Sequence, residues 1–465
     1  MSFERVVQSR LCVGCGACGV VDPSIAIQET CEGCFIAYAP KKLGVDTTAK
    51  LDLVCPFSDQ SLSETELGCE LFSQYCNHRN DHLGWWYSTY VGYVRDDRVR
   101  ARASSGGIGR WLLAALLSRN LVDACIHVRA RTDQTAPGPL FSYAVSRTAD
   151  EVMSSARSAY YPVEMSNVLK HVLEVDGRYV ITGVPCFIKA IRLLQKRESL
   201  FARRIVFAIG LFCGHLKSSF YAEMLAWQLG ISPSELRWID FRDKSVSRTA
   251  KDKGVVASSC NLEGRKGPRV ARELFGADYD LGFFQYPACD YCDDVAAETA
   301  DVVVGDAWLP EYIPDRKGTS LVVVRHREID RLLQDGVHRG ELQLSPIDPA
   351  RIVESQAGAF RHRHEGLAFR LYLDERAGRW HPRKRVAAGC RHISPLRRRI
   401  YRTRIQMREA SFHAFRLARE LGDFEVFRRT MEPLVRRYRK LYRTTLLQRV
   451  IRKIHRLVSR LWGVA

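Results

Sequence analysis

The chain has 465 residues, of which 46% are hydrophobic and 26% charged, as is typical of a soluble globular protein with more than one structural unit. No run of about 18 apolar residues or apolar leader is present, which excludes a membrane span and leads us to expect a cytoplasmic protein with reduced cysteines. The net charge of +19 is uneven, because residues 381–465 hold 24 Lys and Arg against 5 Asp and Glu.

The first motif runs from Leu11 to Cys18 and reads Leu-Cys-Val-Gly-Cys-Gly-Ala-Cys. Two residues separate each pair of neighbouring cysteines, and the glycines let the backbone wrap closely around a point where the thiolates of Cys12, Cys15 and Cys18 converge. This is the compact part of an iron–sulfur ligand set. Zinc also accepts cysteine pairs, but three cysteines at this spacing favour a cubane cluster. The alternative is a merely structural group of reduced thiols.

Cys55 is the predicted fourth ligand, because Pro56 follows it and cluster-binding domains often end their ligand set with Cys-Pro. Cys31 and Cys34 form another C-x-x-C pair that could hold a second metal or replace Cys55, although we favour spare thiols. Residues 1–89 are therefore predicted to form a small ferredoxin-like iron–sulfur domain.

A predicted strand over 90–94 and an apolar-periodic helix over 111–117 flank a loop rich in Ser, Gly and Arg. Hydroxyls, free backbone N–H groups and the positive end of the helix dipole at such a helix start suit a phosphate. An ordinary N-cap with a flexible loop explains the motif equally well. The loop residues in question are Ser104, Ser105, Gly106 and Gly107, preceded by Arg100 and Arg102.

Strands and helices then alternate, which predicts an α/β body with an at least partly parallel, mixed sheet over residues 90–379. The predicted strands cover 122–128, 141–145, 179–182, 204–212, 236–241, 255–258, 301–304 and 320–324. The predicted helices cover 166–175, the stretch from 186 to about 196, 218–229, and a helix that ends near 333.

Four cysteines of this body are notable for their positions. Cys186 and Cys213 each follow the C-terminal end of a predicted strand, where open α/β sheets place their sites. Cys289 and Cys292 form a C-x-x-C pair in a loop. Together they make four thiolates, the number that a cubane cluster needs, although each single cysteine is more often a small buried hydrophobe.

Residues 380–465 are predicted to form a basic helical tail. From Leu434 onward the apolar residues recur at helical i, i+3, i+4 spacing, with Arg and Lys on the other face and Trp462 near the end. The stripe could pack on the protein's own body, lie on an anionic membrane surface, or contact a nucleic acid or acidic partner. We disfavour nucleic acid because no stacking platform accompanies the charge. We interpret His362 and His364, which lie among arginines, as a solvated face.

Taken in order, these motifs resemble the family of the coenzyme F-420 hydrogenase/dehydrogenase beta subunit, over about residues 5–346. The resemblance depends on order and spacing, since no single motif would suffice. Where many relatives have a further Cys-Pro after the first motif, this chain has Asp22-Pro23. The motifs are Cys12/Cys15/Cys18, Val54-Cys-Pro56, Val91-Gly-Tyr, Arg102-Ala-Ser-Ser-Gly-Gly107, Thr182-Gly-Val-Pro-Cys186, Ile209-Gly-Leu-Phe-Cys213, Asp240-Phe-Arg-Asp-Lys244, Cys289-x-x-Cys292 and the stretch from Ala300 to Asp306 and Trp308.

The resemblance implies an oxidoreductase with FAD and two 4Fe–4S clusters that relays electrons to a substrate or to a deazaflavin coenzyme (F-420). It implies that Ser104 to Gly107 hold flavin phosphate beside Arg102, that Arg242 and Lys244 lie near the cofactor, and that the four body cysteines hold the second cluster. FAD suits this role because it accepts single electrons and delivers hydride.

Two other functions compete with an autonomous enzyme. The chain could be an electron-transfer subunit of a larger complex, or a membrane-associated iron–sulfur protein of the polysaccharide-biosynthesis type. Ferredoxin or F-420 is the expected electron partner, and a homo-oligomer is a further expectation. Neither the substrate nor the direction of electron flow follows from the sequence.

Overall fold

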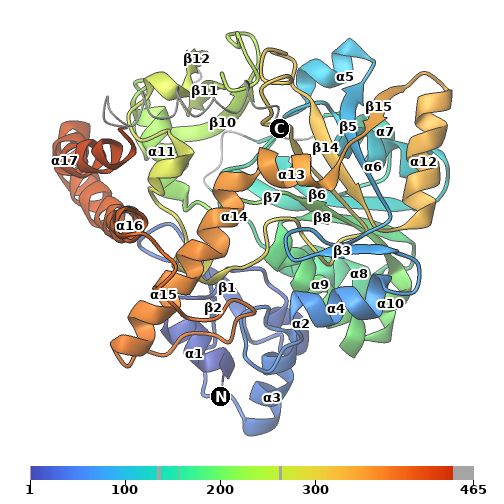
Figure 1. The fold of residues 1–465 in the computed structure, drawn as a ribbon, viewed down its shortest axis with the longest axis horizontal. Coiled ribbons are helices and arrows are strands. Elements are labelled where there is room, and N and C mark those ends of the chain that lie inside the picture. The colour runs from blue at the N-terminus through green and yellow to red at the C-terminus, as the bar shows by residue number, and fades with distance from the viewer. Residues whose placement is uncertain (1, 134–137, 155–156, 261–263, 444–465) are drawn as a thin grey trace, which may run out of the picture.

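The computed structural model describes residues 2–133, 138–154, 157–260 and 264–443. At its centre lies an eight-stranded mixed sheet with the order β15-β5-β14-β13-β9-β8-β6-β7 (Figure 1). Its strands are β5 (Ser88–Val94), β6 (Ala124–Ala130), β7 (Phe141–Ser146), β8 (Tyr179–Gly183), β9 (Ile205–Leu211), β13 (Val302–Asp306), β14 (Ser320–Val324) and β15 (Leu342–Pro346). The predicted mixed α/β body is confirmed.

The four central strands β13, β9, β8 and β6 pair in parallel, whereas the outer pairings are antiparallel. Alternate residues of a strand point to opposite faces, so Val302 and Val304 enter one core while Val303 enters another. One face packs on α6 (Ile108–Ser118) and α12 (Arg327–His338), and the other packs on α8 (Ser166–Glu174) and α9 (Pro185–Arg197). Smaller helices complete this part, namely α5 (Asp97–Arg102), α7 (Ala149–Met153) and α10 (Ser199–Arg204).

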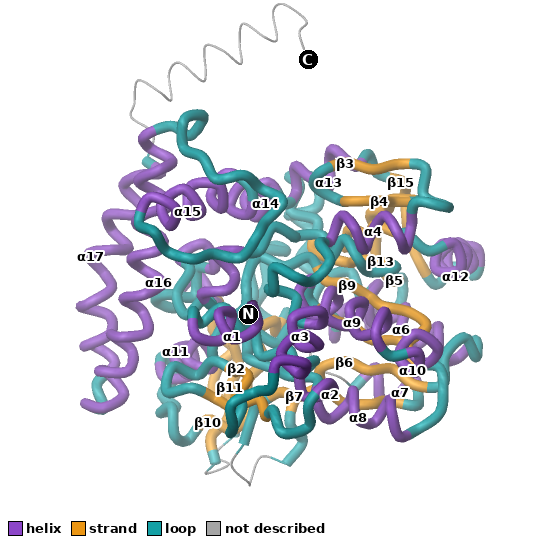
Figure 2. The backbone as a smooth tube through the Cα atoms, turned by 90° about the horizontal axis from the view of Figure 1, so that it is seen from below, coloured by secondary structure: helices purple, strands orange, loops and turns teal. Residues whose placement is uncertain are grey.

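The N-terminal region packs against the α8/α9 face of the sheet (Figure 2). Val6, Leu11 and Val13 share a buried core with Phe187 and Ile191 of α9. The division of the chain at residue 89 therefore stays a prediction, because the apolar contacts run across it. The elements of this region are α1 (Ser2–Gln8), α2 (Cys18–Val21), β1 (Ala26–Glu29), β2 (Phe35–Tyr38), α3 (Val45–Val54), α4 (Glu64–Phe72), β3 (His78–Asn80) and β4 (Gly84–Trp86).

A second core lies beside the main sheet. It joins α11 (Ser219–Trp227) and a three-stranded antiparallel sheet to two long C-terminal helices, α16 (Pro395–Leu421) and α17 (Phe424–Tyr442), which lie side by side in both views (Figures 1 and 2). Phe220 of α11 and Phe284 contact Phe415 of α16. The small sheet consists of β10 (Leu236–Asp243), β11 (Gly254–Ser259) and β12 (Arg265–Val270).

The first part of the basic tail is thus a structural part of the body. Val435 and Tyr438, which belong to the apolar stripe, are buried in the second core. The rest of the stripe, from residue 444, lies outside the described residues, so its contact with a membrane or an acidic partner stays a prediction. None of the helices described here is long and apolar enough to cross a membrane.

The main sheet and the helical hairpin are joined by α13 (Pro349–Ser355), α14 (Ala357–Arg363) and α15 (Glu365–Arg376), which run from the sheet toward α16 (Figure 1). Three short 3₁₀ helices, η1 (Ala271–Glu273), η2 (Tyr279–Leu281) and η3 (Pro287–Tyr291), lie between β12 and β13 in the chain. These connections bring η2, η3 and α14 to the carboxyl ends of β8 and β9.

Candidate functional site

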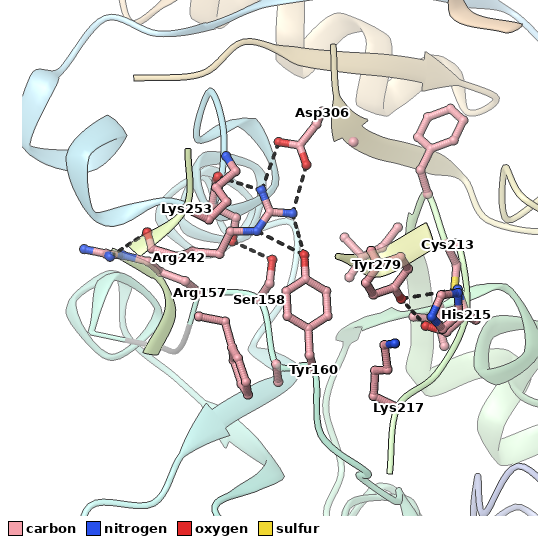
Figure 3. A pocket seen from close by; sticks show the side chains of 18 of the residues that line it. Arg157, Ser158, Tyr160, Cys213, His215, Lys217, Arg242, Lys253, Tyr279 and Asp306 are labelled. Atoms are coloured by element: carbon pink, nitrogen blue, oxygen red, sulfur yellow. Dashed lines mark hydrogen bonds and ion pairs between the residues drawn. The ribbon is translucent and has the colours of Figure 1, made fainter. Parts of the chain in front are cut away.

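A cavity of about 1110 Å³ opens between the carboxyl ends of the central strands, the small sheet and α14. Such a position is where open α/β sheets bind ligands. Its wall includes the loop before α6, the segments after β8 and β9, and residues of β10, η2 and α14. Figure 3 shows that Arg242, Lys253 and Asp306 lie at one end, whereas Cys213, His215 and Lys217 lie at the other.

The loop before α6 forms the first end of the cavity. Gly107 is the N-cap of α6 and has a φ of +90°, which glycine adopts without strain, and no side chain caps the helix. The first backbone N–H groups of an uncapped helix remain available to an anion. Ser104, Ser105 and Gly107 line the cavity here, and Ser158 donates a hydrogen bond of 3.1 Å to the Ser104 hydroxyl.

Several cations surround this loop. Arg242 forms an ion pair of 3.0 Å with Asp306 and donates hydrogen bonds to the hydroxyl of Tyr160 (Figure 3). Arg157 pairs with Asp240 at 2.9 Å. Lys253 also lines the cavity, and burial together with nearby Arg242 lowers its pKa to about 8. This end therefore carries more cationic than anionic groups, as a phosphate site requires.

Three of the predicted cofactor residues, Arg102, Gly106 and Lys244, do not line the cavity. The Nζ of Lys244 donates hydrogen bonds of 2.7, 2.8 and 2.6 Å to the carbonyls of Arg100, Ser105 and Lys317. Arg102 is exposed. A Cβ on Gly106 would come within 2.7 Å of the Gly92 carbonyl and 2.9 Å of Ser320, so this glycine is required for packing on β5 and β14. Lys244 and Gly106 position the loop.

The four body cysteines come together at the second end of the cavity. Cys186 lies in the first turn of α9, directly after β8, and Cys213 follows β9, the parallel neighbour of β8. Cys289 lies in η3 and Cys292 follows it. Burial raises the pKa of Cys186 well above its ordinary value, and the neighbouring Cys292, Cys213 and Cys289 raise it further. Cys213 also lines the cavity.

Arginines from the C-terminal half surround this body set (Cys186, Cys213, Cys289 and Cys292). Arg363 of α14 is 3% exposed and donates hydrogen bonds to the backbone carbonyls of Cys289 and Gly214. Asp290, between Cys289 and Cys292, pairs with Arg408 of α16 at 2.7 Å. Burial alone would raise the pKa of Asp290, but Arg408 and Arg370 lower it.

Two basic residues in the segment before α16 also form ion pairs near the body set. Lys384 pairs with Asp293 at 3.0 Å, and Arg385 pairs with Glu298 at 2.8 Å. Asp293 and Glu298 are buried, at 2% and 4% exposure. Part of the tail's positive charge therefore neutralises carboxylates beside the C-x-x-C loop.

The N-terminal cysteines form a second group. Cys12 and Cys15 lie in the loop that leads into α2, Cys18 is the first residue of α2, and Cys55 is the C-cap of α3. Burial raises the pKa of Cys18 well above its ordinary value, and its neighbours Cys15, Cys12 and Cys55 raise it further. The Sγ of Cys12 accepts hydrogen bonds from the backbone N–H groups of Gly14 (3.4 Å) and Ala37 (3.3 Å). The structure thus brings all four residues of this N-terminal set together.

The two sets lie close to each other, and Tyr143 lies near one cysteine of each. Cys15 contributes to the raised pKa of Cys186, and burial, Cys186 and Cys15 together raise the pKa of Tyr143. The Tyr143 hydroxyl donates a hydrogen bond of 2.9 Å to the Thr182 carbonyl. Of the remaining pair, Cys34 is buried and Cys31 is exposed.

The donor chemistry of both sets fits a polynuclear cluster. The described residues contain no group of three or more His, Cys, Asp or Glu side chains spaced for a single metal ion. A cubane holds its four cysteines farther apart, because iron and sulfide occupy the centre. Buried thiolates that repel one another are costly unless a metal binds them. Each set thus brings together four cysteines, the ligand type and number that a 4Fe–4S cluster uses.

Sequence reasoning missed several residues of the cavity. His362 does not lie on a solvated face: it lines the cavity and its Nε2 lies 3.2 Å from a guanidinium nitrogen of Arg404. His215 and Lys217 also line the cavity and are nearly fully buried. Their positions two and four residues after Cys213 are the signal that could have revealed them. The cavity residues from α16 and α17 give no such signal, because only the tertiary fold brings them near.

Comparison with known proteins identifies the family. The models for the N-terminal and C-terminal parts of the coenzyme F-420 hydrogenase/dehydrogenase beta subunit match residues 89–170 and 176–350. One subunit of the F(420)H(2) dehydrogenase of Methanosarcina mazei is 21% identical over 323 residues, which cover 66% of this chain and 79% of that protein.

A solved structure is also similar. A chain of the xenon-derivatised F-420-reducing nickel–iron hydrogenase complex from Methanosarcina barkeri has a TM-score of 0.49 and 14% identity, over 66% of this chain and 99% of that one. The two family models together span more than half of the 465 residues. The chain therefore belongs to the family of the coenzyme F-420 hydrogenase/dehydrogenase beta subunit, a family of oxidoreductase subunits.

Proposed function

We propose that this protein is an iron–sulfur flavoprotein that passes electrons between two 4Fe–4S clusters, FAD and a substrate or coenzyme F-420. The observation that carries this proposal is the position of Cys213, which belongs to the body set and also lines the cavity. A cluster on that set would lie beside whatever occupies the cavity. The N-terminal set would hold the other cluster, and Tyr143 lies near one cysteine of each set.

The flavin is proposed for the same cavity. The uncapped start of α6 with Ser104 and Ser105 would hold its phosphates, and Arg242 would lie close by, held in place by Asp306 and Tyr160. When bound, FAD would accept single electrons from a cluster and deliver them as hydride. The chain's own part is to bind and orient the cofactor and to shield it from water, since most of the wall is buried or half-buried.

An electron-transfer subunit without activity of its own is the second candidate. The name of the similar Methanosarcina mazei protein describes one subunit of a dehydrogenase, and therefore a part of a larger assembly. Other subunits would then be the partners, in place of ferredoxin or free F-420. The homo-oligomer and the peripheral membrane contact stay predictions.

Turnover of the purified chain separates these candidates. The full-length protein is prepared without oxygen, and the oxidation of reduced ferredoxin or reduced F-420 is followed without added subunits. We expect the bound flavin to be reduced by one of the two donors. Flavin and iron that are present but never reduced by either donor would favour the second candidate, and protein without flavin would contradict the proposal.

A further inference from the structure

The inner end of the cavity, away from the Ser104 loop, collects basic groups that the electron path does not use. We propose that this inner end binds an anionic group of the substrate, a phosphate or a carboxylate, and that α16 and α17 contribute Arg404 and Arg439 to the site. The inference rests on the proposed function, because it assumes that the substrate meets the flavin in this cavity. The residues that carry it are His215, Lys217, Arg404 and Arg439, all of which line the cavity.

His215 offers a free polar atom inside the cavity wall. The side chain is 4% exposed, and its ring stacks on Tyr279 with 3.9 Å between centroids (Figure 3). Among the described residues, its Nε2 has no hydrogen-bond partner. A buried polar atom without a partner costs free energy that a ligand can recover.

Lys217 places a basic amino group near this atom. It is 2% exposed, and its Nζ donates a hydrogen bond of 2.7 Å to the Phe283 carbonyl while facing the rings of Tyr221 and Tyr279. None of the carboxylates in the described part of the chain forms an ion pair with it. Burial and the nearby Arg404 lower the pKa of Lys217 well below its usual value, and an anion bound beside the amino group would favour its protonated form.

Arg404 is held so that it faces the same space. One of its terminal nitrogens donates a hydrogen bond of 2.8 Å to the Asp280 carbonyl and lies 3.2 Å from the Nε2 of His362. Arg439 also lines the cavity and is exposed to solvent. Asp278 and Asp280 also line the cavity; burial raises the pKa of Asp278, and the charges of Arg439 and Lys217 lower it in part.

Both arginines lie outside the part of the chain that the family models match. The family models match residues 89–170 and 176–350, so α16 and α17 lie outside both. His215 and Lys217 lie inside the matched part. A site completed by an added helical hairpin suggests that the hairpin selects the substrate. The flavin itself is the other source of an anionic group, so the test has to separate the two.

Phosphate titration tests the proposal. Full-length protein with flavin and iron bound is titrated with inorganic phosphate by calorimetry at constant ionic strength. The variants are Arg404→Gln and Arg439→Gln. The matched controls are Arg399→Gln on α16 and Arg437→Gln on α17, which remove the same charge from exposed positions that do not line the cavity. Flavin content, iron content and the melting temperature are recorded for every sample first.

We expect phosphate to bind the wild type and both controls equally. Arg404→Gln should weaken binding about tenfold or more, because a charged hydrogen bond is lost, and Arg439→Gln by a smaller factor because it is exposed. No phosphate binding to the wild type, or equal weakening in the controls, would overturn the site. Loss of flavin in Arg404→Gln with unchanged phosphate affinity would assign the anion to the cofactor instead. Wild-type protein purified without flavin would contradict the proposed function. The anion site would still be tested, by comparing the phosphate affinity of that protein with the affinity of Arg404→Gln.

Discussion

The two cysteine sets are built in different ways. The N-terminal set is local, since three of its thiols lie within seven residues of chain and the fourth caps a short helix. Gly14 and Gly16 in this loop have φ angles of +63° and +87°, and a Cβ on Gly14 would meet the Phe35 carbonyl at 2.5 Å. Backbone freedom at two glycines thus shapes the whole ligand loop.

The body set is non-local and depends on charge. Its four thiols come from two parallel strand ends and a loop about 75 residues farther along the chain. Five basic residues located after β15 bind the carbonyls and carboxylates around it. They are Arg363, Arg370, Arg408, Lys384 and Arg385. The basic C-terminal region therefore supplies buried and half-buried cations around the body set, in addition to the charges that it presents to solvent.

The largest expected effect follows from deleting the tail. A chain that ends after Trp380 loses α16, α17, Lys384 and Arg385, and exposes Phe220 and Phe284. We expect it to be insoluble, whereas a chain that ends after Arg443 should stay soluble and keep both cysteine sets. Expression and gel filtration of the two truncations measure this. A soluble, iron-loaded 1–380 chain would refute the structural role of the hairpin.

The 1–443 chain also tests the membrane prediction. If residues 444–465 lie on an anionic surface, intact protein should sediment with anionic vesicles at low salt and the 1–443 chain should not. Sedimentation of both chains alike, or of neither, would contradict that prediction.

Replacing one cysteine should remove the cluster of its own set and leave the cluster of the other set in place. Serine binds iron poorly, so Cys186→Ser should lose the body cluster and about half of the iron, and Cys15→Ser should lose only the N-terminal cluster. Iron and sulfide analysis of the two variants under anaerobic conditions measures the loss. Cys125→Ser serves as a control, because Cys125 is buried but belongs to neither set. Unchanged iron in Cys186→Ser would contradict its assignment.

Removing one tail arginine should lower the stability of the fold around the body set without removing any of its cysteines. Arg385→Gln removes a positive charge that pairs with the buried carboxylates of Glu298 and Asp293. Breaking a buried ion pair costs about 3 kcal/mol, so the free energy of unfolding should fall by that amount in denaturant titration. The neighbouring Arg383→Gln, at an exposed position, should change it by less than about 0.5 kcal/mol. Equal effects from both would show that the charge pairing is unimportant.

The smallest effect concerns pH. Burial lowers the pKa of His127 in β6 to about 4, and its Nε2 lies 2.8 Å from the Ser146 hydroxyl. The unfolded chain binds a proton near pH 6.5 and the folded chain does not, so stability falls as the pH drops from about 6.5 toward 4. His127→Asn should remove about 1 kcal/mol of the loss between pH 7 and 5.5. The exposed His413→Asn should leave that loss unchanged.

Much of this arrangement could be predicted from the sequence. The predicted strands, the position of Cys186 and Cys213 after parallel strands, and the helix start at Ser104 to Gly107 follow from local patterns, and the structure contains them. Local patterns do not reveal which distant groups meet. They therefore leave the position of the tail open and predict a solvated His362, whereas tertiary packing buries the first part of the tail and places His362 in the cavity wall.

Glycine positions show the same limit. The sequence predicts that the Gly106 backbone approaches a phosphate, but its missing side chain makes room for β5 and β14. The sequence alone cannot separate these two reasons for a glycine, because both require the absence of a Cβ.

The central claim is that each of two cysteine sets holds a cluster next to one flavin. Anaerobic purification of the full-length chain, followed by iron, sulfide and flavin analysis per mole of protein, tests it most directly. We expect about eight irons, about eight sulfides and one FAD per chain. About four irons would remove one of the two clusters, and protein with neither iron nor flavin would contradict the account.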